Sequence, residues 1–239
     1  MELLEFFAEC RRDASVKEVS QALGYPQSST SVLLNALADA GYFDRDPHTG
    51  RFAPSIRVLL ATEWIGEQLF SERSLLRLMD SVLEETGYTV MIGTQHGAQV
   101  RYLHVLQSTR EGRFIARTGA LRPLFRSAAG KMLLTVKPER EIALLLRRAN
   151  ALEKERLNRL EFDAVIEELQ AVRRQGYSVS LGTAQTGAAA LAILLPVPRD
   201  KKPLTLSIGG PIPEVQAKKQ RLVDVLHRAV EHLRRVAER

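Results

Sequence analysis

The sequence predicts an α+β protein of two domains that a helix joins. Helical periodicity over residues 1–41 gives way to two short aromatic runs around a turn, and apolar residues then recur at helical spacing over residues 56–70. From residue 71 onward, strand-like runs alternate with helices. We therefore expect a small domain over 1–55, a linker helix over 56–70, and a larger domain over 71–239 in which helices pack on an antiparallel sheet.

Two short helices follow one another near the N-terminus. The first ends at Gly24, which can take the left-handed conformation that closes a helix, and Pro26 suits the start of the next. A gap of about four residues between two helices is typical of a helix-turn-helix. The inward face of the first helix is expected to carry Val16, Val19, Ala22 and Leu23.

The second helix has one apolar and one polar face. Leu33, Leu34 and Leu37 fall at helical spacing and are expected to point inward, and Gly41 ends the helix. Short polar side chains on the other face can lie close to the edges of DNA bases. That outer face carries Gln27, Ser28, Ser29, Ser31, Val32 and Asn35.

A β-hairpin is expected directly after the helix pair. Tyr42-Phe43 and Arg51-Phe52 flank residues 44–50, which contain Asp, Pro and Gly. Helix pairs joined by a glycine turn also occur in all-helical domains that never contact DNA. The hairpin favours a winged helix-turn-helix over that alternative.

These residues resemble a known family. Gly24-Tyr25-Pro26-Gln27-Ser28-Ser29 and Arg45-Asp46-Pro47-His48-Thr49-Gly50-Arg51-Phe52 are similar to the recognition-helix start and wing tip of the IclR family of transcription regulators. The resemblance implies that this domain binds DNA. Gln27 and Val32 stand where family members usually carry basic residues, so the resemblance does not specify the DNA sequence that is read.

Composition and charge bound the function. The 239 residues are 45% hydrophobic. The one cysteine, Cys10, is expected to be an inert thiol in a reducing cytoplasm. No run of residues is as apolar and as long as a membrane span. The net charge is +6, but residues 1–70 hold six basic and ten acidic residues and are acidic overall. Because phosphate neutralisation supplies most non-specific affinity, this half is expected to need a partner subunit to bind DNA.

The elements outside the motif can be placed by periodicity. Leu3, Leu4, Phe6 and Phe7 predict a first helix, and Trp64 on the linker helix is expected at a domain or subunit contact. Later helices are expected over 75–86, 139–148, 162–175 and 213–235, and strands over 88–94, 99–106, 114–118, 177–181, 188–197 and 204–208.

A loop over residues 119–126 leads into a helix that opens with small residues. Its exposed N–H groups, at the positive end of the helix dipole, suit a carboxylate. An ordinary N-cap by Ser127 with close packing at Gly130 explains the same residues equally well.

The C-terminal half also resembles the IclR family, whose effector-binding domain has a GAF-like fold. Arg122-Pro123-Leu124, Gly130-Lys131, Gly176-Tyr177-Ser178-Val179 and Ser207-Ile208 fall in family order. The resemblance places an effector pocket at the helix start and the strands after Gly176 and before Gly210. Ser180 and Ala190 replace an acidic residue and a cysteine that relatives usually carry, so we expect a more apolar acid, such as an aromatic carboxylate. The expected pocket residues are Met91, Tyr102, Phe125, Arg126, Ser127, Ala128, Ala129, Ser180, Ala190 and Ser207.

No pattern in the sequence suggests catalysis. We find no nucleophile elbow, no metal-ligand spacing and no phosphate-binding glycine loop, and so expect neither metal nor cofactor. The expected function is ligand-responsive DNA binding by a dimer or tetramer, with a small-molecule enzyme or sensor and an RNA-binding winged helix as alternatives. Base edges would be read by Ser28, Ser29, Ser31 and Asn35, and phosphates or the minor groove would be held by Gln27, Arg45, His48 and Arg51.

Overall fold

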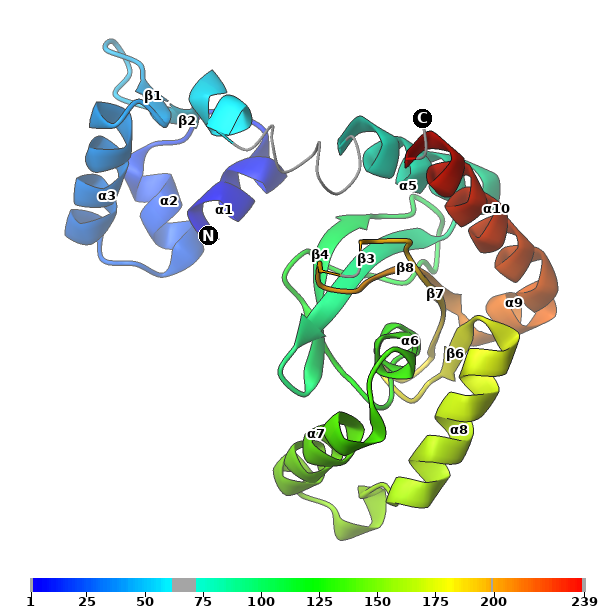
Figure 1. Cartoon of the computed structure of the whole chain (residues 1–239). Helices are drawn as coiled ribbons and strands as arrows, with labels where there is room; N and C mark the ends of the chain where they lie inside the picture. The colour runs from blue at the N-terminus through cyan, green and yellow to red at the C-terminus, as the bar shows by residue number, and fades with distance from the viewer. Residues whose placement is uncertain (1, 62–71, 199, 238–239) are drawn as a thin grey trace. The chain divides into compact units, whose positions relative to one another are not determined.

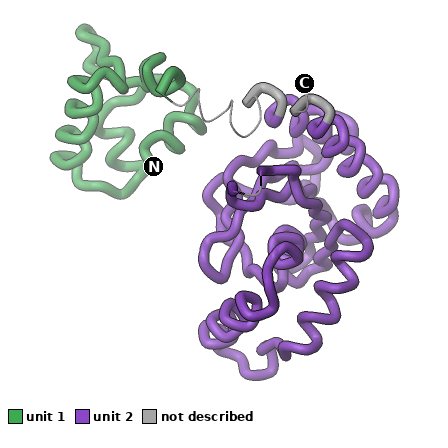
Figure 2. The backbone as a smooth tube through the Cα atoms, viewed as in Figure 1, with its two compact units in different colours: residues 1–69 green, residues 70–239 purple. Residues whose placement is uncertain are grey.

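The structure is a computed structural model that describes residues 2–61, 72–198 and 200–237. The chain divides into two compact units, residues 1–69 and 70–239 (Figure 2). Each unit has a sheet of its own, two-stranded in unit 1 and six-stranded in unit 2.

Unit 1 begins with three helices and a hairpin, and a further helix starts after the hairpin (Figure 1). Ser15 caps the second helix through a capping box with Glu18, and Gly24 ends that helix in the left-handed conformation at φ 68°. Both features confirm the predicted helix-turn-helix. The elements are α1 (Glu2–Cys10), α2 (Val16–Leu23), α3 (Gln27–Asp39), β1 (Phe43–Arg45) and β2 (Phe52–Pro54), with β1 and β2 antiparallel.

The core of unit 1 joins every element of the motif. It contains Leu3, Phe7, Ala14, Val19, Leu34, Phe43 and Phe52. Two residues that we expected to point inward, Ala22 and Leu33, are exposed instead, and so is Leu4 of the predicted first helix. The buried stripe of α3 runs through Thr30 and Leu34, so Leu33 lies at its border and is 41% exposed. Thr30 can be buried because its hydroxyl donates to the Pro26 carbonyl at 3.0 Å.

The helix expected after the hairpin begins where the sequence places it. Residues 56–61 are helical, and the Ser55 hydroxyl accepts from the Arg57 N–H at 3.2 Å. Arg57 also donates to the Ala40 carbonyl at 2.9 Å and so ties this helix to the end of α3. The rest of the predicted linker, with Trp64, lies outside the described residues.

Unit 2 contains one antiparallel sheet of six strands in the order β5-β4-β3-β8-β7-β6. The strands are β3 (Thr89–His96), β4 (Gln99–Leu106), β5 (Leu121–Pro123), β6 (Ser178–Leu181), β7 (Ala188–Leu194) and β8 (Leu204–Pro211). The helices are α5 (Glu72–Thr86), α6 (Ala128–Thr135), α7 (Glu139–Leu152), α8 (Phe162–Gln175), α9 (Ile212–Ala217) and α10 (Lys219–Ala237), and a 3-10 turn spans Arg156–Asn158.

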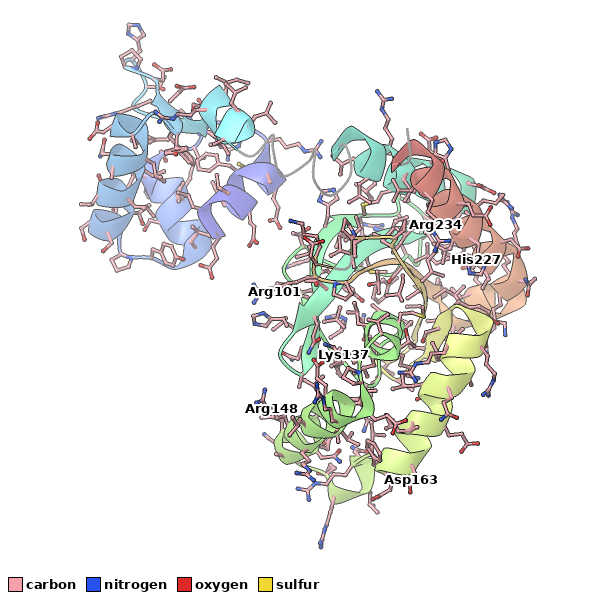
Figure 3. All side chains as sticks on the ribbon, in the orientation of Figure 1. Arg101, Lys137, Arg148, Asp163, His227 and Arg234 are labelled. Atoms are coloured by element: carbon pink, nitrogen blue, oxygen red, sulfur yellow. The ribbon has the colours of Figure 1, made fainter. Side chains whose placement is uncertain are left out.

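Helices cover both faces of this sheet. The short helix α6 packs on one face and α8 packs behind it, whereas α5 and α10 pack together on the other face (Figure 1). Side chains fill the space between these layers (Figure 3). Along β7, Ala192 joins the α6 side of the core, where it packs with Met91, Ala128 and Met132. Next to the start of α6, the strands contribute the small residues Ser180 of β6, Ala190 of β7 and Ser207 of β8.

Two predicted elements differ from the structure. Residues 114–118 form no strand, because the place beside β4 is taken by residues 119–123, which include β5. The Phe114 carbonyl instead accepts from the side chains of Thr89 and Gln107, each at 2.6 Å. The predicted helix over 213–235 is two helices that meet at Lys218.

Candidate DNA interface and effector pocket

The first turn of α3 presents exposed polar groups. Gln27, Ser28 and Ser29 are exposed, and Pro26 stands at the N-cap position, where no side chain caps the helix. The N–H groups at the positive end of this 13-residue helix are therefore free of a competing side-chain acceptor. A DNA phosphate is the kind of group that such a helix start binds.

Further along α3 the structure brings three predicted residues together. The Asn35 amide donates to the Ser31 carbonyl at 2.9 Å, and Arg45 Nη1 on β1 donates to Asn35 Oδ1 at 3.2 Å. Arg45 is exposed and its Cζ lies 5.6 Å from the Phe52 ring centroid. Helix and hairpin thus share one polar surface, with Arg45 as its cation.

His48 lies at the exposed tip of the hairpin. The Asp46 carboxylate accepts from the N–H groups of His48 at 2.7 Å and Thr49 at 3.2 Å, and these bonds lower the pKa of Asp46. The carboxylate is thus used to shape the turn. The His48 ring is exposed next to that turn.

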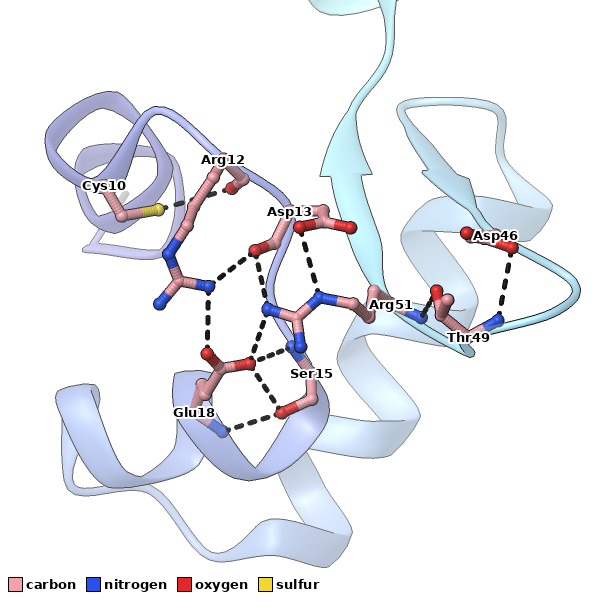
Figure 4. A network of polar contacts seen from close by, with 8 residues as sticks. All are labelled: Cys10, Arg12, Asp13, Ser15, Glu18, Asp46, Thr49 and Arg51. Atoms are coloured by element: carbon pink, nitrogen blue, oxygen red, sulfur yellow. Dashed lines mark hydrogen bonds and ion pairs between the residues drawn. The ribbon is translucent and has the colours of Figure 1, made fainter.

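Arg51 has a different environment from the other predicted DNA contacts. Its Nε lies 3.1 Å from Asp13 Oδ1 and its Nη2 lies 2.8 Å from Glu18 Oε2 (Figure 4). The carboxylates of Glu18 and Asp13 neutralise the charge of this guanidinium and raise the pKa of Arg51 above its usual value. Arg51 therefore joins the hairpin to the start of α2, whereas Arg45 keeps a charge that faces solvent.

The predicted effector site corresponds to a small pocket at the start of α6. Seven of the ten expected residues line it, namely Tyr102, Ser127, Ala128, Ala129, Ser180, Ala190 and Ser207. Ser127 caps the helix by accepting from the Gly130 N–H at 3.1 Å, as the N-cap alternative predicted. A Cβ at Gly130 would lie 1.9 Å from the Leu124 carbonyl oxygen, so close packing at this glycine is also confirmed.

The other three expected residues lie elsewhere. Met91 is fully buried in the core beneath α6, and Phe125 and Arg126 line a separate surface pocket next to α7. Arg126 pairs there with Glu153 at 3.7 Å. None of the three lines the pocket at the start of α6.

Sequence reasoning missed two polar residues of the pocket, Arg122 and Gln185. Arg122 Nη2 donates to Gln185 Oε1 at 3.0 Å, and its Cζ lies 5.6 Å from the Tyr102 ring centroid. Burial raises the pKa of Tyr102, and the positive charge of Arg122 opposes that shift. The two residues are far apart in the sequence, and no local motif connects them.

The described residues show no group of three or more His, Cys, Asp or Glu side chains placed to hold a metal ion. Within the same residues, no helix has the length and apolar character needed to cross a membrane.

Comparisons with protein families cover both units. The family described as "Bacterial transcriptional regulator IclR C-terminal" matches residues 72–235, and "IclR helix-turn-helix domain" matches residues 1–47. The transcriptional repressor IclR of Escherichia coli (strain K12) is 25% identical over 221 residues, which cover 90% of this chain and 79% of that protein. The glycerol operon regulatory protein of Streptomyces coelicolor is 24% identical over 196 residues, covering 80% and 74%.

Solved structures agree with the fold. The Thermotoga maritima IclR structure matches with a TM-score of 0.67 at 20% identity, covering 99% of this chain and 96% of that one. An IclR effector domain from Acinetobacter sp. ADP1 matches with a TM-score of 0.64 at 29% identity, covering 69% and 96%. The curated proteins that are similar to this chain are transcription regulators rather than enzymes. The chain itself belongs to the IclR family of DNA-binding transcriptional regulators.

Proposed function

We propose that the protein is a cytoplasmic regulator that binds an operator as a homodimer, or as a dimer of dimers, and responds to a small carboxylate. Residues 1–55 bind DNA, residues 56–70 link the domains and residues 71–239 bind the effector. The exposed, uncapped start of α3 and the hairpin that contacts α3 at Asn35 support this function most directly.

Each subunit would dock α3 into one half-site. Ser28, Ser29, Ser31 and Asn35 would read base edges, and Gln27, Arg45 and His48 would contact phosphates or the minor groove. Arg51 would act indirectly, by holding the hairpin through Asp13 and Glu18. Two such helices in a dimer would lie about 34 Å apart, which is one turn of DNA.

The effector would bind at the start of α6. The Ser207 hydroxyl is buried there without a partner, and the pocket walls are otherwise rich in alanine. A carboxylate on a small apolar or aromatic body matches that combination. Effector binding would change the spacing of the two DNA-binding units, with a coupling free energy of about 1 to 3 kcal/mol.

The enzyme alternative is not favoured, because the relatives are transcription regulators.

Double-stranded DNA can be distinguished from RNA by selecting a bound sequence from a random duplex DNA library and measuring competition by the same sequence as RNA. Competition by RNA equal to that by DNA would contradict operator binding.

Ser29→Asp tests the recognition surface. Because Ser29 is exposed in the first turn of α3, the substitution places a negative charge against DNA without disturbing the core. We expect loss of binding to the selected operator in a mobility-shift assay and an unchanged circular dichroism spectrum. Ala8→Asp, at an exposed position of α1, is the control that adds the same charge to the unit, and it should bind far better than Ser29→Asp. Equal operator affinity of Ser29→Asp and wild type would contradict the assignment of α3.

A further inference from the structure

Two polar groups in the pocket at the start of α6 are unsatisfied. Four side-chain atoms of the described residues are buried without a hydrogen-bond partner, namely Arg101 Nε, Arg122 Nε, Ser178 Oγ and Ser207 Oγ, and the Arg122 and Ser207 atoms belong to one pocket. Leaving a buried donor unpaired costs free energy, so an unpaired hydroxyl and an unpaired guanidinium N–H in one pocket indicate a ligand with acceptor oxygens.

The positive charge of Arg122 is also uncompensated by its recorded contacts. Nη2 donates to Gln185 Oε1 at 3.0 Å, Nη1 donates to the Leu121 carbonyl at 2.9 Å, and the guanidinium lies over the Tyr102 ring. All three of these partners are neutral. A hydrogen bond from guanidinium to carboxylate is about twice as strong as a neutral one, and the planar fork can hold both carboxylate oxygens.

Gln185 belongs to a loop that closes the pocket. Residues 182–187 join β6 to β7. Besides the bond between Gln185 and Arg122, the Thr183 hydroxyl of this loop donates to the Arg126 carbonyl at 2.7 Å. The free volume beneath the loop is about 10 Å³, which is the space of one water molecule. Any larger ligand must displace part of the wall, and Gln185 is an exposed side chain on a loop.

We propose that Arg122 is the carboxylate-binding residue of this pocket and that Gln185 is its internal competitor. An anionic effector replaces the Gln185 amide oxygen as acceptor of the guanidinium and also accepts from the Ser207 hydroxyl. The 182–187 loop then loses one of the two side-chain hydrogen bonds described above. The inference rests on the proposed effector role of the pocket. It assigns specificity to a pair of residues, one from β5 and one from the β6–β7 loop, that the sequence did not predict for the pocket.

The test compares carboxylates with their uncharged isosteres on the full chain. Acetate, benzoate, phenylacetate and 4-hydroxybenzoate are each paired with the primary amide and screened by thermal shift, and the best pair is measured by calorimetry. We expect at least one acid to bind at least about tenfold more tightly than its amide, since a hydrogen bond to a charged group contributes about 1.5–3 kcal/mol. Arg122→Gln should remove that preference, and Gln185→Ala should strengthen binding of the acid severalfold.

Arg117→Gln is the matched control, because Arg117 is an exposed arginine of the preceding loop that does not line the pocket. It should keep the affinity of wild type for the acid. The proposal is overturned if Arg122→Gln keeps the acid preference, if Gln185→Ala weakens binding of the acid, or if no acid in the panel binds better than its amide.

Failure of this inference can be separated from failure of the proposed function. If an amide binds and shifts operator affinity in a mobility-shift assay, the regulator function stands while the role of Arg122 is wrong. If acids bind through Arg122 and no duplex is ever selected, the role of Arg122 stands while operator binding fails.

Discussion

Glu18 is the residue on which the polar network of unit 1 depends. Its carboxylate accepts from the Ser15 N–H and hydroxyl, each at 2.8 Å, and pairs with Arg12 at 2.9 Å and Arg51 at 2.8 Å (Figure 4). These bonds, the Ser15 backbone N–H first, lower the pKa of Glu18 from its usual 4.5 to about 2. The ionised form therefore connects the cap of α2 to the hairpin.

The lowered pKa predicts acid sensitivity of unit 1. Between pH 4.5 and about 2 the unfolded chain holds the Glu18 proton more tightly than the folded one, so the contribution of this carboxylate is complete above pH 4.5 and is lost as pH falls toward 2. A carbon-13 titration should place the Glu18 midpoint near pH 2. Glu18→Gln should lower the melting temperature at pH 7 and have little effect near pH 2. Glu9→Gln, at an exposed position of α1, should leave the melting temperature unchanged both at pH 7 and near pH 2. A Glu18 midpoint at pH 4 or above would contradict this account.

At the scale of elements, α6 is positioned by contact with the chain that precedes it. Gly130 lies against the Leu124 carbonyl oxygen, 1.9 Å from where a Cβ would lie, whereas a Cβ at Gly209 would meet the Phe114 ring at 2.5 Å. The backbone carbonyl of Leu124 can move less than the side chain of Phe114 to make room for a methyl group. Both glycines therefore set how closely their elements pack.

Gly130→Ala is accordingly expected to destabilise unit 2 more than Gly209→Ala. Overpacking typically costs about 1–3 kcal/mol, and the backbone clash places Gly130→Ala at the upper end. For a domain of this size each kcal/mol corresponds to about 2–4 °C in melting temperature. Differential scanning calorimetry of both variants checks the order, and a larger loss for Gly209→Ala would show that α6 can shift.

Element boundaries were predictable where a local signal exists. The ends of α2 and α8 follow from Gly24 and Gly176, which both adopt the left-handed conformation. The error at 114–118 arose because an alternating apolar run can cover the sheet without pairing to it: Phe114 and Ala116 are buried, yet belong to no strand. Ser127, Ala128 and Ala129 were predicted as pocket residues because the family resemblance places the pocket at this helix start. Arg122 and Gln185 meet only through sheet topology, since they are 63 residues apart.

At the scale of the whole molecule, charge and exposed apolar surface both favour a dimer. Residues 1–70 carry six basic against ten acidic residues, while the rest of the chain carries 28 against 18. Few phosphates can be neutralised by one acidic unit, so we expect affinity to come from two units on one duplex. Ile56 and Leu60, one helical turn apart, are 68% and 59% exposed, and we expect this apolar pair to contact a second copy.

The double variant Ile56→Glu with Leu60→Glu tests this dependence. Four added charges at a two-fold contact would repel, so we expect monomers in analytical ultracentrifugation. Operator affinity should fall by about 100-fold or more, because the gain from linking two binding units is typically 10²–10⁴. Leu157→Glu, at a leucine that is 99% exposed in unit 2, adds charge to the other unit and should leave both measurements unchanged. If the double variant stays dimeric and binds the operator like wild type, the apolar face of residues 56–61 is not the dimer contact. The affinity of the acidic unit would then depend on contacts made through unit 2.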